Sequence, residues 1–117
     1  MDARLAATPE PPYWAVIFSS HRTGAEAERY ARTAEAMVRL AARQPGFLGV
    51  ESARDAEGFG ITVSYWASAE AIAAWKQEAA HLAAQRAGHE TFYADFVTRV
   101  ARVERAYTLA GSPRTGL

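Results

Sequence analysis

Cysteine is absent from this chain of 117 residues, and its absence excludes three kinds of chemistry. Without thiols there is no disulfide framework, no thiolate zinc site and no cysteine nucleophile. Charge of one sign is not in excess either, because 13 basic side chains balance 13 acidic ones. A chain without a basic surplus gives no reason to expect nucleic acid or an anionic membrane surface as a partner.

Long hydrophobic runs are also missing. No apolar stretch approaches the roughly 18 residues of a membrane span. The N-terminal MDARLAATPEPP lacks the long apolar core of a signal peptide. We therefore expect a cytoplasmic protein with no membrane partner. Half of the residues are apolar, which predicts a packed core rather than disorder.

The length favours one folded domain with two looser ends. Residues 1–12 are rich in alanine and proline and predict a flexible N-terminal arm. Residues 13–107 carry the periodic apolar patterns of a folded domain. Residues 108–117 predict a flexible C-terminal tail.

Apolar periodicity predicts six elements in the order strand, helix, strand, strand, helix, strand. The expected ranges are Tyr13–Ser20, Ala25–Arg43, Phe47–Arg54, Phe59–Trp66, Ala69–Ala87 and a last strand between 92 and 107. The stretch HRTG after Ser20 breaks the first strand. Ser68 is expected to cap the second helix by accepting a first-turn amide, and Gly88 to stop it.

This element order predicts an α+β fold of the ferredoxin-like βαββαβ kind, with a four-stranded antiparallel sheet and two helices on one face. The turn DAEG at 55–58 joins the two middle strands as a hairpin. The first strand is apolar on both of its faces, although helices would cover only one. Because an uncovered apolar sheet face is not expected in a monomer, we predict a homodimer packed sheet against sheet.

Motifs of familiar catalysis are missing. The glycine-rich stretches GFLGVESAR and EGFGITV lack the lysine and the spacing of phosphate-binding loops. His21, His81 and His89 are far apart in the sequence and form no HExxH pattern, so no metal site is expected. No serine lies in a nucleophile elbow.

The remaining signal is aromatic, in the stretch YWASAEAIAAWKQEAAH at 65–81. Trp75 lies in the middle of an apolar stripe on the second helix, so packing on the sheet is the simplest interpretation. His81 lies about 120° around the helix from Trp75, at the border of that stripe. It is either a solvated or capping histidine or a residue that reaches a cavity. Trp66 shares a strand face with Ser64, where it packs in a dimer interface or walls a pocket.

Further residues are candidates for the walls of such a pocket. Aromatic candidates are Tyr13, Tyr30, Tyr65, Phe92 and Tyr93. Arg22, Arg86 and Arg99 are candidates to hold an anionic or phenolate oxygen, with a surface arginine as the alternative for each. The many alanines of the second helix bring it close to the sheet or leave a pocket beside the larger rings.

The stretches PGFLGVESAR and GITVSYWASAEAIAAWKQEAAH resemble the antibiotic biosynthesis monooxygenase (ABM) domain family, of the dimeric α+β barrel superfamily. The resemblance covers about residues 13–107. It implies a ferredoxin-like protomer, a homodimer built through the sheets, and a pocket between helices and sheet. Some members of the family oxidise polycyclic phenols with molecular oxygen and no cofactor. In those members the tryptophan that Trp66 matches lies in or near the substrate pocket.

Other members of that family degrade haem, and this chain departs from their pattern. Trp75 matches their helix tryptophan, but the first strand offers Ser19 or Ser20 where they have asparagine. His81 follows Trp75 by one turn less than their haem ligand does, and Gln85 is nearer that place. Haem is therefore not the expected ligand.

Three hypotheses follow. The first is a cofactor-independent monooxygenase acting on a small aromatic or phenolic metabolite, with His81 as proton acceptor. The second is a non-catalytic small-molecule-binding or stress-response protein on the same fold, and the third is haem binding. Under the first, the catalytic candidates are His81 and Trp66, and the substrate-binding candidates are Tyr65, Trp75, Arg86 and Tyr30.

Overall fold

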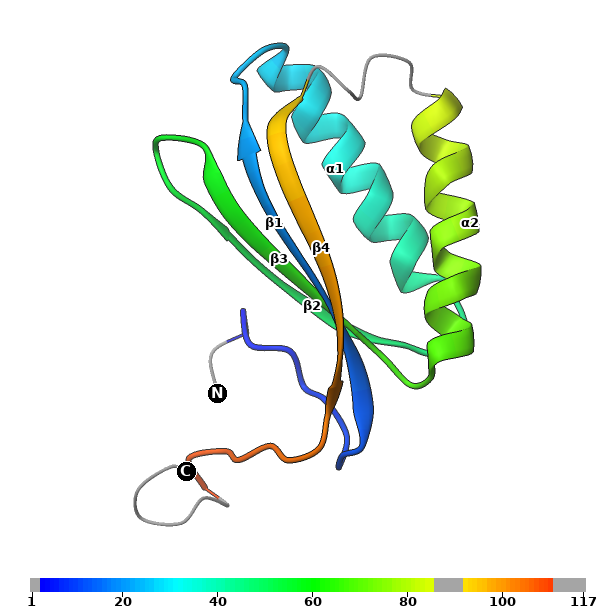
Figure 1. Cartoon of the computed structure of the whole chain (residues 1–117). Coiled ribbons are helices and arrows are strands. Elements are labelled where there is room, and N and C mark those ends of the chain that lie inside the picture. Colours follow the sequence, from blue (N-terminus) through cyan, green and yellow to red (C-terminus); the bar gives the residue numbers. More distant parts are fainter. Residues whose placement is uncertain (1–2, 86–91, 111–117) are drawn as a thin grey trace.

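Six elements follow one another in the expected order in a computed structural model, which describes residues 3–85 and 92–110. They are β1 (Tyr13–Arg22), α1 (Ala27–Ala42), β2 (Phe47–Arg54), β3 (Phe59–Trp66), α2 (Ala69–Gln85) and β4 (Tyr93–Val103). Both helices lie on the same side of the sheet, and the described residues before β1 and after β4 lie at its other side (Figure 1). The predicted ferredoxin-like α+β architecture is confirmed.

The four strands form one antiparallel sheet in the order β2-β3-β1-β4. Because side chains alternate along a strand, the register assigns every residue to one of two faces. Trp14, Val16 and Phe18 of β1 point to the face that the helices cover, which we call the helix face. Tyr13, Ala15 and Ile17 point to the other, which we call the open face.

β1 is longer than the sequence indicated. His21 pairs with Phe59 of β3 and with Asp95 of β4. The Arg22 amide donates to the Gly58 carbonyl at 2.9 Å. The expectation that the strand stops at Ser20 is therefore wrong, because partners on both sides extend it. The predicted bounds of β2 and β3 are confirmed, whereas Gly88, the expected stop of α2, lies outside the described residues.

The start of α2 and the end of α1 meet at a close contact. The Ala71 amide donates to Ser68 Oγ at 3.1 Å, which confirms the predicted cap. Gly46 has φ +88°, and a Cβ built there would lie 2.7 Å from the Cβ of Ala71. Glycine is therefore required at 46 both by its backbone angle and by the approach of α2.

The main core lies between the helices and the helix face. Its buried members are Ala41, Trp66 and Ile72, and half-buried side chains pack around them: Trp14, Val16, Phe47, Ala71 and Trp75. The predicted stripe of α2 faces this core, since Ile72 is buried while Trp75, Ala79 and Leu82 are half-buried. Helix periodicity thus positions Trp75 against the sheet.

The open face is covered in part by the N-terminal arm. The Ala6 amide donates to Glu51 Oε2 at 3.0 Å, and the Thr8 hydroxyl lies 3.0 Å from the Tyr13 hydroxyl. Elsewhere on this face large apolar side chains stay exposed, namely Phe59, Ile61 and Val97. The arm therefore reaches only one end of the face.

Candidate functional site

Trp66 lies wholly inside the core. Its exposed fraction is 0 %, its ring meets Phe47 edge-on at 5.4 Å, and its Nε1–H donates to Ser64 Oγ at 2.9 Å. Its ring also stacks on Trp75, with centroids 5.8 Å apart and 23° between the planes. The interpretation that Trp66 packs in a dimer interface is wrong, because its ring lies on the helix face. Trp66 can influence a ligand through Trp75.

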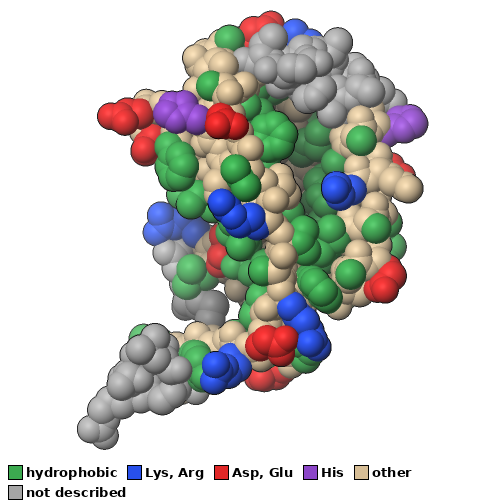
Figure 2. Space-filling model, in the orientation of Figure 1, with side chains coloured by type: hydrophobic (Ala, Val, Ile, Leu, Met, Phe, Trp, Pro, Cys, Tyr) green, Lys and Arg blue, Asp and Glu red, His purple; other side chains and the backbone are tan. Residues whose placement is uncertain are grey.

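A hollow lies on the helix face between β4 and α2. Figure 2 shows hydrophobic side chains in the depth of this hollow. On its β4 side, Phe96 is 56 % exposed and Val100 is 53 % exposed, although both point to the face that the helices cover. The helices pack mainly on β2 and β3, and α1 meets β4 at its start through Tyr30 and Tyr93, so the part of β4 around Phe96 and Val100 is left open. We call this depression the helix-face hollow.

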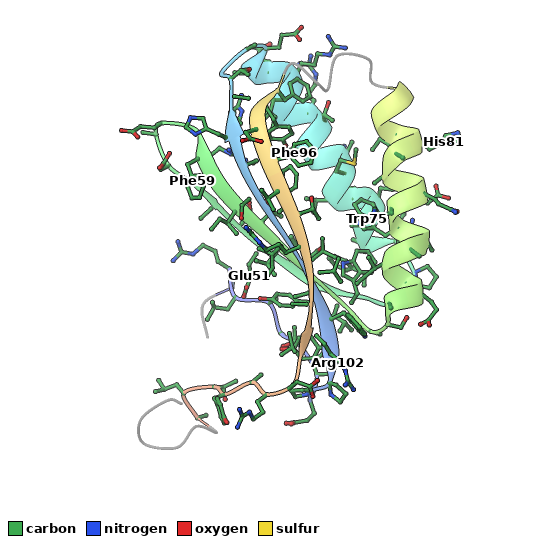
Figure 3. The ribbon with its side chains drawn as sticks, in the orientation of Figure 1. Glu51, Phe59, Trp75, His81, Phe96 and Arg102 are labelled. Atoms are coloured by element: carbon green, nitrogen blue, oxygen red, sulfur yellow. The ribbon has the colours of Figure 1, made fainter. Side chains whose placement is uncertain are left out.

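The sequence-predicted site residues divide between the two faces of the sheet. Trp66 and Trp75 come together on the helix face, and Phe96 and Trp75 lie on that side in Figure 3. Tyr65 precedes Trp66 in β3 and therefore points to the open face. It meets Tyr13 there, edge to face at 5.9 Å. Tyr65 does not share a wall with the two tryptophans.

His81 and Arg86 fall outside the cluster of tryptophans. His81 is exposed near the end of α2 and points away from Trp75 (Figure 3). Arg86 lies outside the described residues. In the described part of the chain, therefore, the structure brings no imidazole of α2 to the helix-face hollow.

Tyr30 lies in a cationic cluster that the sequence indicated only in part. The Arg22 guanidinium carbon lies 3.8 Å from the centre of the Tyr30 ring, and that of Arg54 lies 5.8 Å from it. Arg54 is held in place, because its Nη2 donates to Ser20 Oγ at 2.7 Å and its Nη1 donates to the Gly58 carbonyl. Arg22 was a candidate from the sequence, and Arg54 was missed. Strand alternation is the sequence signal for both arginines, since it places them on the helix face, which also carries buried aromatic residues.

Tyr93 completes this cluster from β4. Its ring lies 5.9 Å from that of Tyr30 and 5.2 Å from that of Phe18. Burial raises the pKa of the Tyr93 hydroxyl above its ordinary value, and the hydrogen bond with Tyr30 adds to the rise, while Arg54 and Arg22 oppose it. Tyr93 therefore stays a neutral phenol at neutral pH and can donate a hydrogen bond.

A separate cavity of about 730 Å³ lies on the open face, between the arm and the residues after β4. Tyr65 and Glu51 form its polar wall, with the Tyr65 hydroxyl donating to Glu51 Oε1 at 2.6 Å. The arm supplies Leu5 and Thr8, and the tail supplies Tyr107 and neighbouring residues. Sequence reasoning missed Glu51, because nothing in the strand pattern signals that the arm folds back to it.

Groups that would hold a metal are not gathered in the described part of the chain. Across residues 3–85 and 92–110, no three His, Asp or Glu side chains come close enough to share an ion. His89 lies outside these ranges. Within the same ranges, no helix is long and apolar enough to cross a membrane.

Comparison with known proteins places this fold and sequence in context. Residues 12–87 match the family described as antibiotic biosynthesis monooxygenase. The uncharacterized protein YqjZ of Bacillus subtilis is 54 % identical over 101 residues, which cover 86 % of this chain and 88 % of that protein.

Two solved structures share the fold. One is SnoaB, a cofactor-independent oxygenase from Streptomyces nogalater, with a TM-score of 0.62 and 16 % identity; the match covers 85 % of this chain and 98 % of SnoaB. The other is NE2512, a protein of unknown function from Nitrosomonas europaea, with a TM-score of 0.67 and 12 % identity; the match covers 88 % of this chain and 100 % of NE2512.

Proposed function

Because the chain belongs to the antibiotic biosynthesis monooxygenase family, we propose that it binds a small aromatic, phenol-like metabolite in the helix-face hollow and oxidises it with molecular oxygen. One observation carries the choice of this site. Phe96 and Val100 are more than half exposed on the helix face, beside a core of stacked indoles. Exposed apolar side chains that line a hollow are suited to hold a flat aromatic ring.

The proposed reaction needs neither a metal nor an organic cofactor, because the substrate itself supplies the electrons. An anthrone-like phenol loses a proton, and its anion gives one electron to dioxygen. The two radicals combine to form a carbon–oxygen bond, and the resulting peroxide anion takes up a proton, in place of the one that the phenol lost, to give a hydroperoxide. Loss of water then leaves a quinone, with one oxygen atom of dioxygen in the product and the other in water. The protein contributes by binding the ring and stabilising the anion.

The roles of the candidate residues follow from their places. Trp75 and Tyr30 are proposed to contact the substrate, while Trp66 acts as a positioning residue that holds Trp75. His81, the proposed proton acceptor, points away from Trp75 and would accept the proton through solvent (Figure 3). Arg86 stays a sequence-based candidate. Tyr65 lies on the open face, so it does not contact a substrate in the helix-face hollow.

Oxygen uptake tests the proposal. Anthrones and hydroquinones are offered in air, and the rate is compared between the wild type and Val100→Trp, which fills the open side of the hollow. We expect uptake by the wild type and a loss of most of it in Val100→Trp. The control is Val38→Trp, the same substitution at a side chain 45 % exposed on α1. No uptake with any of these substrates, or equal rates in the wild type and Val100→Trp, would contradict the proposal.

A binding role without turnover is the second candidate, and the orientation of His81 favours it. A proton acceptor works best within hydrogen-bond reach of the proton it takes. This candidate predicts that aromatic compounds raise the melting temperature of the protein while oxygen uptake stays at the uncatalysed rate. His81→Ala would then leave both the thermal shift and the background rate unchanged.

We also propose a homodimer, built through the open face, in the cytoplasm. Ile61 of β3 and Val97 of β4 both lie opposite Ser19 of β1, so they flank it on one continuous surface. Both are exposed, as is Phe59 at the end of β3. A second copy would remove this apolar surface from water, which is the usual driving force of association.

A further inference from the structure

Arg22 carries polar hydrogens for which residues 3–85 and 92–110 supply no acceptor. Its Nε and Nη2 atoms are buried and have no hydrogen-bond partner. Among the residues that the structure describes, the only other buried side-chain atom without a partner is Thr33 Oγ1, one turn along α1 from Tyr30. A buried donor on a charged group without an acceptor is costly, so it calls for a partner that the described residues do not supply.

The surroundings of Arg22 are positive. Arg54 adds a second guanidinium, whose carbon lies 5.8 Å from the centre of the Tyr30 ring, and its own hydrogen bonds go to Ser20 and Gly58. The ion pairs of the described residues are elsewhere: Arg29 with Glu26, Arg32 with Glu28 and Arg102 with Glu104. Across the described ranges, neither Arg22 nor Arg54 is paired with a carboxylate. Two cations without a counter-charge attract an anion.

Aromatic contacts connect this positive cluster to the helix-face hollow. Phe96, at the exposed edge of β4, lies 5.4 Å from Phe18 and 6.3 Å from Tyr93 between ring centres. Tyr93 in turn lies against Tyr30, whose ring carries the Arg22 guanidinium. A series of packed aromatic rings therefore connects the open edge of the hollow to a cation. A ligand with a flat apolar body and one anionic oxygen matches this arrangement.

We propose that Arg22 is an anion-binding residue which holds the ionised oxygen of an aromatic ligand, a phenolate or a carboxylate, while the ring of that ligand lies on Phe96 and Phe18. Arg54 is a positioning residue, because it adds positive charge from a fixed place. The inference rests on the proposed function in one respect, which is that both use the helix-face hollow. If it holds, Arg22 favours deprotonation of a bound phenol by stabilising the anion, with no base beside the substrate.

Binding of stable probes tests this site without any turnover. Affinities for 2-naphthoate and for its neutral match 2-naphthamide are measured by calorimetry on the wild type, Arg22→Met and Arg22→Lys. Arg32→Met removes an exposed arginine of α1 and is the control. We expect Arg22→Met to bind 2-naphthoate at least about tenfold more weakly, or about 1.4 kcal/mol, with little change for 2-naphthamide. Arg22→Lys keeps the charge but loses the fork of donors and should fall between.

Binding of a phenolate is tested by a separate measurement of absorbance. 4-Nitrophenol is coloured when ionised, so its pKa can be read by absorbance in the bound state. We expect the wild type and Arg32→Met to lower the pKa of bound 4-nitrophenol by about one unit, since a tenfold preference for the anion equals one unit. Arg22→Met should abolish this shift. A response to only one of the two probes would identify which anion the site takes.

Several results would overturn the inference. One is equal affinity of the wild type for 2-naphthoate and 2-naphthamide, with no shift in the pKa of bound 4-nitrophenol. Another is equal affinity of the wild type and Arg22→Met for 2-naphthoate, again with no shift in that pKa. Absence of binding to any probe would show that water alone satisfies Arg22. Should Arg22→Met fail to fold by circular dichroism, Arg22→Lys and the wild-type comparison still decide. Anion binding without oxygen uptake would keep this site and reject the monooxygenase, whereas uptake at the wild-type rate in a folded Arg22→Met would keep the monooxygenase and reject this site.

Discussion

The indole ring of Trp75 covers that of Trp66, with ring centres 5.8 Å apart and 23° between the planes. Trp66 is fully buried, and Trp75 is half-buried. Trp66 therefore contributes mainly to the stability of the core, whereas Trp75 contributes both to the core and to the candidate site. Substitutions at the two positions should separate these roles.

Trp66→Ala should lower the free energy of unfolding by about 3–5 kcal/mol, because it leaves a large cavity in a packed core. Trp75→Ala should cost less, because that ring is only half-buried. The measurement is urea unfolding followed by circular dichroism. A larger loss for Trp75→Ala than for Trp66→Ala would contradict this account of the core.

Gly46 and Gly24 offer a matched pair of substitutions. Both have positive φ, +88° and +83°, but a Cβ at 46 would lie 2.7 Å from the Cβ of Ala71, while a Cβ at 24 meets nothing within 4 Å. Gly24→Ala should lower the free energy of unfolding by about 1 kcal/mol from backbone strain alone. Gly46→Ala should lower it by about 1–3 kcal/mol more, since α2 must move. Equal losses in the two variants would show that α2 does not press on residue 46.

Tyr65 should make the protein sensitive to alkali. Its burial, and then its hydrogen bond to Glu51 and the charge of that carboxylate, raise the pKa of Tyr65 above its ordinary value of 10.0. A group whose pKa is higher in the folded state contributes stability that is complete below the unfolded value and is lost as pH rises above it. Above a pH of about 10, the free energy of unfolding should therefore fall more steeply in the wild type than in Tyr65→Phe. Urea titrations over a series of pH values measure this, and parallel curves would be the contrary result.

Ile61→Glu should convert the proposed dimer into a monomer. The substitution places a charge in the middle of the apolar patch on the open face, where a partner would have to bury it without a counter-charge. Sedimentation at micromolar concentration should give the mass of two chains for the wild type and of one chain for Ile61→Glu. Val38→Glu, on the outer surface of α1, should remain a dimer. A wild type with the mass of one chain would contradict the proposed interface.

Much of the fold could be predicted because its signals are local. The alternation from Phe59 to Trp66 defined β3 to the residue, and Ser68 marked the start of α2. The order of elements then permitted few topologies, because crossovers between strands have one hand. The family resemblance led to the same fold and was confirmed by the match over residues 12–87.

The candidate site was less predictable. Tyr65 and Trp66 were grouped as walls of one pocket because they are adjacent in the sequence, yet adjacency in a strand puts them on opposite faces. Arg54 was missed because no periodic pattern connects it to its partners. Ser20 is distant from it in the sequence, and Gly58 lies in the turn between β2 and β3. His81 was placed at the border of a stripe, and only the packing of α2 decided that its ring faces outward (Figure 3).

The sequence by itself determined the elements, their faces and the burial of the two-sided strand β1, because periodicity of apolar side chains is a property of neighbours along the chain. Tertiary structure alone decided that the helices approach β2 and β3 and leave Phe96 and Val100 uncovered. It also decided that the Arg22 guanidinium lies on the Tyr30 ring with two buried donors unused. Both depend on where α1 and α2 come to rest on the sheet, which is set by side-chain packing between segments far apart in sequence.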